Sequence, residues 1–170
     1  MNTVSQWPPR TRDVQATVEA YERVLGWPLI VNATLVSAQR ALAVLACDLD
    51  ATLSVPCSGF DAVSMPYRVG VELLVLLGRQ GTDHVPALIN AEVDVVFLVQ
   101  LATGTELAEM PGVSIASGPG GRLFVPPSHG WHWDTPPWQP RAAQAVELLP
   151  GREIASPLRT ALRMTNGTAP

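Results

Sequence analysis

Residues 51–66, ATLSVPCSGFDAVSMP, decide the fold that the sequence predicts. The segments ATLSVP (residues 51–56) and FDAVSMP (residues 60–66) are short apolar runs of the kind that forms half-buried strands. The three residues between them, Cys-Ser-Gly, are small and of the type found in turns. We therefore predict two short neighbouring strands at the centre of the chain, with a turn at residues 57–59.

Outward from this stretch, helical and strand-like patterns follow one another irregularly. Apolar residues recur at helical spacing on both sides of it, and short apolar runs bounded by turn residues come later. This order is typical of an α+β protein with a mixed or antiparallel sheet and flanking helices, because regular α/β alternation is missing. We expect the strands at 84–90 and 94–101 to be antiparallel neighbours. The other predicted elements are helices at 11–25, 37–49, 69–77, 141–149 and 156–164, a helical turn at 106–110, and strands at 27–33, 112–117, 117–128 and 130–138.

Length and composition limit the classes of protein. The 170 residues predict one domain, 1–170, with flexible ends at residues 1–10 and 165–170. Only 15% of residues are charged, the net charge is −4, and all 11 basic residues are arginines, so we do not expect nucleic acid as a partner. The apolar runs are too short to span a bilayer, and nothing around the two cysteines indicates secretion. We expect a cytoplasmic protein without a membrane partner.

Several segments, taken in order, resemble the bifunctional primase/polymerase (prim-pol) domain of the archaeo-eukaryotic primase superfamily. VLGWPLIV is similar to the family's helix end and Gly-Trp-x-hydrophobic strand, and residues 51–66 look like its paired strands around a small-residue turn. VVFLVQL takes the place of the next core strand. SGPGGRLFVPPSHGWHW resembles the family's Gly-rich turn, strand, Pro-Pro-Ser loop and Trp-bearing strand. The resemblance covers residues 14–160 and implies a primase-polymerase-like fold.

The chain departs from this family at the catalytic positions. Active members end the second strand with Asp-x-Asp, two carboxylates that share Mg²⁺, whereas Ser64 and Pro66 stand near those places here. Asp61 is a lone acid earlier on the strand, and the family's nucleotide-contacting histidine is missing from residues 94–101. The cysteines and histidines also lack zinc-site spacing. We therefore expect neither polymerase activity nor a metal or other cofactor.

The densest cluster of chemically versatile side chains is SHGWHWD at residues 128–134. On a strand, Trp131 and Trp133 share one face, while His132 and Asp134 share the other, roughly 7 Å apart. The tryptophans would form an aromatic wall for an apolar ligand, and the other two would cooperate in acid–base catalysis. The alternative is that both tryptophans fill the core and His132 faces water.

Five further residues complete the predicted site. Glu72 lies on the mostly apolar helix 69–77, where burial in a cleft would raise its pKa and make it a catalytic acid or base; an exposed helix edge is the alternative. SGPGGR, residues 117–122, suits a phosphate cradle or a hairpin turn, and the turn is favoured because no helix follows. The remaining expected ligand-binding positions are Ser128, His129, Asp61 and Ser64.

Three classes of function stay open. We favour a primase-polymerase-like domain that has lost polymerase chemistry and binds a small apolar molecule, with cofactor-free cyclisation, isomerisation or rearrangement as its reaction in bacterial specialised metabolism. The second class is a nucleotide- or DNA-binding replication protein. The third is a non-catalytic interaction domain that forms a homodimer. The second class requires one basic surface, formed by Arg10, Arg12, Arg68, Arg122 and Arg141.

Overall fold

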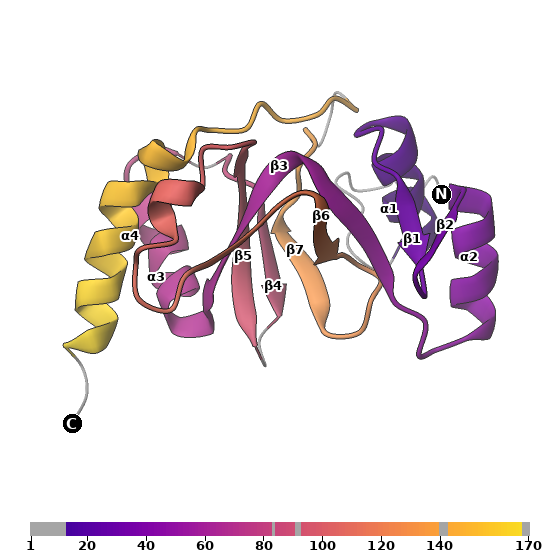
Figure 1. The fold of residues 1–170 in the computed structure, drawn as a ribbon, viewed down its shortest axis with the longest axis horizontal. Coiled ribbons are helices and arrows are strands. Elements are labelled where there is room, and N and C mark those ends of the chain that lie inside the picture. The colour runs from indigo at the N-terminus through magenta and orange to yellow at the C-terminus, as the bar shows by residue number, and fades with distance from the viewer. Residues whose placement is uncertain (1–12, 83, 91–92, 140–142, 168–170) are drawn as a thin grey trace, which may run out of the picture.

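The computed structural model describes residues 13–82, 84–90, 93–139 and 143–167, which form four α-helices and one seven-stranded antiparallel sheet (Figure 1). The predicted α+β class with an antiparallel sheet and flanking helices is confirmed. Within these ranges, no helix is long and apolar enough to cross a bilayer. The predicted flexible end at residues 1–10 lies outside the described residues. Thr165 and Asn166, expected in the other flexible end, belong to the last helix instead.

The centre of the sheet is β3 (Leu53–Pro66), one 14-residue strand where the sequence predicts two. The predicted turn at residues 57–59 is wrong, because the chain continues through these residues in the strand. Instead, the pairing of β3 with β6 (Ser114–Phe124) shifts register on both sides of Cys57. The small residues therefore mark an irregularity inside a long strand.

This irregularity changes which side chains of β3 point into the same core. Val55 and Cys57 pack in one hydrophobic cluster, and so do Phe60 and Ala62. Odd and even positions of a regular strand face opposite sides, so residues 57–60 must contain a bulge that inverts the alternation. Beyond the bulge, the odd residues Val63 and Met65 face the second core.

The other strands assemble around β3 in the order β2-β1-β3-β5-β4-β7, with β6 pairing to β3 off this path. Near its start β3 pairs with β1, and from Phe60 to Pro66 it pairs with β5. The pairing of β4 with β5 confirms the predicted antiparallel neighbours. The bounds are β1 (Leu29–Val31), β2 (Thr34–Val36), β4 (Ala87–Asn90), β5 (Asp94–Gln100) and β7 (Trp131–Thr135).

The glycine-rich segment SGPGGR lies inside β6 and is not the turn between two strands that the sequence predicts. The ladder along β3 passes from Arg122 directly to Gly118, so the residues between them have no partner on β3. A Cβ atom on Gly121 would lie 2.8 Å from the backbone nitrogen and oxygen of Ser117. Only glycine allows this close approach of the backbone to itself.

Four α-helices cover the sheet. Asp13 accepts a hydrogen bond from Ala16 N–H at the start of α1 (Val14–Arg23), and Ser37 accepts one from Arg40 N–H at the start of α2 (Ala38–Cys47). The remaining helices are α3 (Tyr67–Arg79), the short helical turn η1 (Thr105–Leu107) and α4 (Gly151–Asn166). Figure 1 shows α3 and α4 at one end of the sheet and α1 and α2 at the other.

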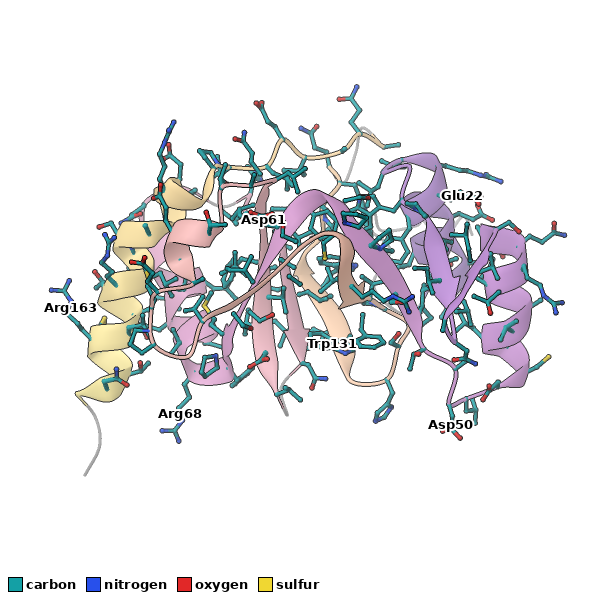
Figure 2. The ribbon with its side chains drawn as sticks, in the orientation of Figure 1. Glu22, Asp50, Asp61, Arg68, Trp131 and Arg163 are labelled. Atoms are coloured by element: carbon teal, nitrogen blue, oxygen red, sulfur yellow. The ribbon has the colours of Figure 1, made fainter. Side chains whose placement is uncertain are left out.

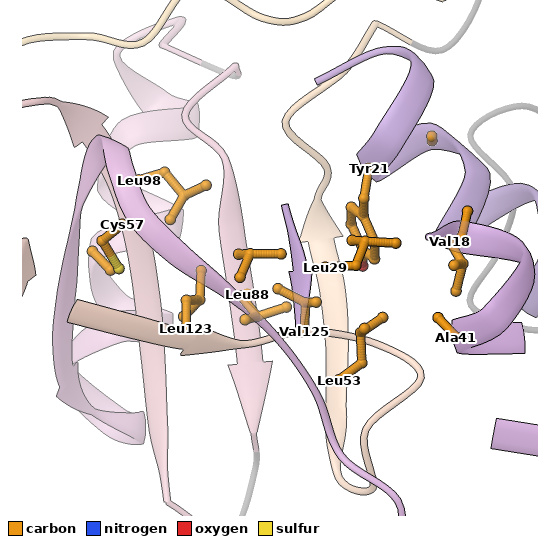
Figure 3. Packing of buried hydrophobic residues seen from close by; sticks show 14 of the residues in the cluster. Val18, Tyr21, Leu29, Ala41, Leu53, Cys57, Leu88, Leu98, Leu123 and Val125 are labelled. Atoms are coloured by element: carbon orange, nitrogen blue, oxygen red, sulfur yellow. The ribbon is translucent and has the colours of Figure 1, made fainter. Parts of the chain in front are cut away.

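Two hydrophobic cores result from this arrangement. The first core joins α1 and α2 to one side of the sheet (Figure 3), and the second joins α3 and α4 to the other side. The strand β5 serves both: Val96 and Leu98 point into the first core, whereas Val95 and Phe97 point into the second. A strand buried on both faces reads as a continuous apolar run, which is how VVFLV appears in the sequence.

The predicted helix at 141–149 is wrong for the residues that the structure describes. Residues 143–149 contain no helix, Ala143 has a positive φ, and the backbone pairs with the chain just after β7: Gln139 N–H donates to the Gln144 carbonyl, and Val146 N–H donates to the Pro137 carbonyl. The predicted helix at 156–164 is confirmed as part of α4, which starts earlier, at Gly151.

Candidate functional site

The predicted tryptophan pair lies where strand alternation places it, on one face of β7. Trp131 and Trp133 are both partly buried and both pack against the first core. Ring contacts fill the surroundings of Trp133: it meets Trp138 edge-on at 6.2 Å between centroids, and Trp138 meets Tyr21 in the same way at 5.8 Å. The Trp133 half of the aromatic wall expected for a ligand is therefore packed against the protein's own rings.

The polar groups of Trp133 and Tyr21 are also paired with each other. The indole N–H of Trp133 donates to the Tyr21 hydroxyl at 2.8 Å, and that hydroxyl donates to the Pro126 carbonyl at 3.0 Å. Burial raises the pKa of Tyr21 far above its ordinary value, so the hydroxyl stays neutral and keeps both bonds. Trp27 also stacks on Tyr21, at 5.8 Å between ring centroids. The arrangement stabilises the core around Tyr21 and Trp133.

The structure does not bring the third predicted catalytic residue, Glu72, to His132 and Asp134. His132 and Asp134 are exposed on the opposite face of β7 from the tryptophans, and His129 is exposed in the preceding turn. Asp134 accepts a hydrogen bond from the hydroxyl of its neighbour Thr135. Glu72 lies half-exposed on α3, which packs on the second core. The sheet thus separates Glu72 from the tryptophans.

Two predicted ligand-binding residues, Ser128 and Asp61, form hydrogen bonds within the fold. The Ser128 hydroxyl is buried, accepts from Leu53 N–H at 2.8 Å and donates to the Leu53 carbonyl at 2.8 Å. Asp61 is fully buried; its carboxylate accepts from Gly104 N–H at 2.7 Å and from the Ser117 hydroxyl at 2.5 Å. In Figure 2, Asp61 and Trp131 lie well apart on the sheet. Both polar groups are engaged by the fold itself.

Ser64, at the place of a missing metal-binding acid, is half-buried on β3 between Val96 of β5 and Ser114 of β6. The neighbouring cross-strand pair places Asp94 beside Pro66. Desolvation raises the pKa of Asp94, a residue that the sequence analysis did not single out. Among the described residues, no group of three His, Cys, Asp or Glu side chains is placed to hold a metal ion.

The expected basic surface is not assembled by the arginines that the structure describes. Arg68 belongs to the first turn of α3, after the end of β3, whereas Arg122 pairs with Pro56 near the start of β3. The bulged second half of β3 separates them. Arg10, Arg12 and Arg141 lie outside the described residues.

A hollow with a different composition lies along α4. This α4 groove, about 700 Å³ in volume, has Met110 and Leu162 on its floor and Pro111 beside them. Polar side chains of α4 stand at its rim. They are Ser156, Arg159, Arg163 and Asn166, and Gly167 also lines the groove.

Helix geometry explains the polar rim. Arg152, Ser156, Arg159, Arg163 and Asn166 follow one another at intervals of four, three, four and three residues, which places them on one stripe of α4. The opposite side of the helix carries the buried residues Ile154, Leu158 and Ala161 of the second core. The helix therefore presents a continuous polar stripe beside an apolar floor.

The arginines of this stripe keep their charges available. Arg23 and Glu19 form the one ion pair within the described ranges, at 3.3 Å, and they lie on α1. Arg163 donates to the Thr160 hydroxyl at 3.2 Å and projects outward from α4 (Figure 2). Arg159 has neither an acidic nor a hydrogen-bonding partner among the described residues. A guanidinium without a protein partner is free to bind a carboxylate or phosphate.

A cluster of hydrogen bonds at Thr103 and Gly104, which we call the knot at residues 103–104, positions the two segments that form the groove. These segments are residues 110–111 and α4. Asp61 holds Gly104, the residue before η1, and η1 leads to Met110 and Pro111. The Thr103 hydroxyl donates to the Gln100 carbonyl at 2.7 Å and accepts from Gly151 N–H, the first residue of α4, at 2.8 Å. A Cβ on Gly151 would lie 2.2 Å from the Thr103 carbonyl oxygen, so glycine is required there. Asp61 thus helps to position the groove but does not line it.

Sequence reasoning missed this groove, although part of its signal was present. GREIASPLRTALRMTN shows the arginine spacing once a helix is assigned to it. The pairing of that stripe with Met110 and Pro111, more than forty residues away, depends on the knot at residues 103–104. Comparison of the chain with models of protein families, with curated proteins and with solved structures finds no match.

Proposed function

We propose that this protein binds a small molecule with an apolar body and one acidic group in the α4 groove. The observation that carries the proposal is the apolar floor of Met110 and Leu162 beside Arg159, whose guanidinium has no partner among the described residues. A volume of about 700 Å³ suits a molecule of drug-like size, since small-molecule sites measure roughly 300–1,000 Å³. The ligand class keeps the predicted apolar molecule, and the site moves from the tryptophans to α4.

In this proposal, the fold derives from that of a prim-pol domain, which the sequence resembles. Ser64 and Pro66 in place of two carboxylates support a loss of polymerase chemistry, because one remaining acid cannot hold two metal ions. A fold that has lost its first function keeps its scaffold and can acquire another site. We place the protein in the cytoplasm, where its free cysteines Cys47 and Cys57 remain reduced.

Catalysis is the further step of the proposal. A cofactor-free cyclisation or isomerisation needs a site that holds one reactive conformer and stabilises developing negative charge. Arg159 and Asn166 are suitable donors for such a charge. The described residues that line the groove include no carboxylate or imidazole, so binding is the primary claim.

Nucleic-acid binding is the second candidate function, and the polar stripe favours it. At 1.5 Å rise per residue, Arg152 and Arg159 are about 10.5 Å apart along α4, and Arg159 and Arg163 about 6 Å. Three cations along one helix face suit a chain of phosphates. This function predicts steep weakening of binding with salt, whereas a single carboxylate in an apolar groove loses much less.

The test compares two ligands that differ only in charge. Isothermal titration with naphthalene-2-carboxylate and with the matching amide separates the arginine contribution from apolar burial. We expect the carboxylate to bind at least tenfold more tightly, about 1.4 kcal/mol, as for a hydrogen bond to a charged group. At about 100 times its Kd, the carboxylate should stabilise the fold by about 2.7 kcal/mol.

Matched variants locate the site. Arg159→Gln should reduce carboxylate affinity about tenfold and leave amide affinity unchanged. Arg40→Gln on α2, an exposed arginine at the other end of the sheet, is the control and should change neither. Equal affinity for carboxylate and amide, or a carboxylate affinity that Arg159→Gln leaves intact, would contradict the proposal. Binding of single-stranded DNA that Arg152→Gln weakens would favour the second candidate function.

A further inference from the structure

The opposite end of the sheet carries an open edge. The strand β2 is the first in the sheet order, so only one of its sides pairs with another strand, β1. A two-residue turn at Asn32 and Ala33, both with positive φ, joins these strands. In such a hairpin, the pair next to the turn, Val31 and Thr34, exchanges hydrogen bonds, and the following pair, Ile30 and Leu35, does not.

Leu35 therefore turns both its backbone N–H and its backbone carbonyl toward the open edge. Among the described residues, neither group has a hydrogen-bonding partner. The Leu35 side chain is 69% exposed, a large value for an apolar residue in a strand. Over its three residues, Thr34–Val36, the edge carries no charge, proline or bulge that would block a further strand. An extended chain can add a strand here.

A hollow adjoins this edge. It has a volume of about 490 Å³, and we call it the β2 pocket. Its apolar lining includes Trp27, Pro28, Leu35 and Val36, and Glu22 of α1 supplies a carboxylate. Trp27 stacks on Tyr21 and lies tilted against Phe60, and these two rings hold it in place beside the pocket.

The carboxylate of Glu22 gives the β2 pocket its charge. One oxygen accepts a hydrogen bond from Ala38 N–H at 3.0 Å, which fixes the side chain against the start of α2. No arginine in the described ranges forms an ion pair with Glu22; the neighbouring Arg23 pairs with Glu19 instead. The second oxygen is available to a cation.

We propose that β2 and the β2 pocket bind an extended peptide that adds a strand beside β2 and places a lysine or arginine side chain against Glu22. Backbone hydrogen bonds to Leu35 would align the peptide, and the pocket would select its side chain, as in other complexes formed by strand addition. Charge complementarity identifies the partner. A second copy pairing through its own Thr34–Val36 would bring no basic residue to Glu22. This site lies apart from the α4 groove and does not depend on the function proposed there.

The probe for the test is a capped, fluorescein-labelled hexapeptide of alternating threonine and valine with one central arginine. Two matched peptides accompany it: one with glutamate in place of arginine, and one with a methyl group on the central backbone nitrogen. We expect the arginine peptide to bind with a Kd of order 100 μM in fluorescence anisotropy, since few hydrogen bonds form. The glutamate and N-methyl peptides should each bind at least fivefold more weakly.

Glu22→Gln tests the charge without removing the acceptor for Ala38 N–H. We expect it to weaken the arginine peptide threefold to fivefold, the range for an exposed ion pair, and to leave the glutamate peptide no weaker. Glu109→Gln, beside η1 at the other end of the sheet, is the control. Equal binding of all three peptides would overturn the proposal. So would a protein dimer, seen by light scattering, that the arginine peptide does not displace.

Discussion

The aromatic cluster around Trp133 and the α4 groove differ in how the protein uses its side chains. The aromatic cluster holds the most distinctive residues of the sequence, yet Tyr21, Trp133 and Trp138 contact one another, and the Trp133 N–H donates to the Tyr21 hydroxyl. The α4 groove is built from ordinary residues, but Arg159 has no partner within the described ranges. The availability of a group for binding depends on what surrounds it, and residue type alone does not reveal it.

The same contrast holds for acids. Asp61 is a buried carboxylate of the kind that often marks an active site, and both of its oxygens are satisfied by the fold. Glu22 is an exposed residue without any unusual feature in the sequence, and it lies in a hollow with one oxygen available. Substitutions and measurements at Trp133, Asp61, the two cysteines and Asp94 can break or sharpen this distinction between internal and available groups.

Trp133→Ala should have the largest effect. Removing the ring leaves a cavity beside Tyr21 and Trp138, and we expect a loss of about 4 kcal/mol in the free energy of unfolding, measured by urea denaturation. Trp133→Phe keeps an aromatic ring but loses the N–H bond to Tyr21, so it should cost about half as much. If Trp133→Ala kept its stability and instead abolished ligand binding, the aromatic cluster would be the binding site.

Asp61→Asn should come next. The amide cannot accept hydrogen bonds at both positions, so either Gly104 N–H or the Ser117 hydroxyl loses its acceptor in a buried place. We expect a loss of about 3 kcal/mol in unfolding free energy. Asp50→Asn, at an exposed position after α2, should change stability by less than about 0.5 kcal/mol.

Asp61→Asn also reports on the groove, since the knot that it belongs to holds Gly104 and, through Thr103, the start of α4. Ligand affinity in the α4 groove should fall in the folded variant, while peptide affinity at the β2 pocket should not. Equal loss at both sites would indicate general loosening of the fold instead of a local knot.

Local sequence signals predict most of the helices and strands well. They predict poorly which distant segments these elements pair with. Helix α2 follows from its cap Ser37 and its apolar spacing, and the β4–β5 pair follows from two apolar runs separated by a short turn. The small residues at 57–59 and at SGPGGR predict turns between strands, and both predictions are wrong because the segments lie inside β3 and β6. Whether such residues make a turn or a bulge depends on which strand lies alongside, and the local sequence does not contain that information.

The candidate site was harder to predict for the same reason. Strand alternation correctly placed Trp131 and Trp133 on one face, but it cannot show that Tyr21, more than a hundred residues away, fills the space beside them. The residues 143–149 have helical composition, yet their backbone pairs with Pro137 and Gln139. In each case a distant partner overrides the local preference.

The two cysteines test burial directly. Cys57 lies in the first core, where burial and then the nearby charge of Asp61 raise its thiol pKa from 9.0 to about 11, whereas Cys47 is exposed on α2. At pH 8 this lowers the thiolate fraction of Cys57 about a hundredfold, so it should react with a disulfide reagent at least a hundredfold more slowly than Cys47. In 8 M urea the two rates should become equal. Comparable rates in the folded protein would contradict this burial.

The raised thiol pKa also determines the direction in which stability changes with pH. Above pH 9 the unfolded chain loses the Cys57 proton while the folded chain keeps it until about pH 11. Unfolding should therefore become easier as pH rises through this window. Cys57→Ala should remove that part of the pH dependence, at the cost of a small cavity.

Asp94→Asn should have the smallest effect, and its sign is informative. Desolvation raises the pKa of Asp94 in the folded state, so the charged form is less favourable there than in the unfolded chain. Stability from this group is complete at low pH and falls as pH rises through the folded pKa, so replacing the acid by a neutral amide should stabilise the protein at pH 7 and not at pH 3. Because the side chain is only half-buried, we expect a gain of at most about 0.5 kcal/mol, measured as the difference between urea midpoints at the two pH values. A loss of stability at pH 7 would mean that the Asp94 carboxylate is held by a partner, which would make the end of the sheet beside Ser64 an internal polar cluster like that of Asp61.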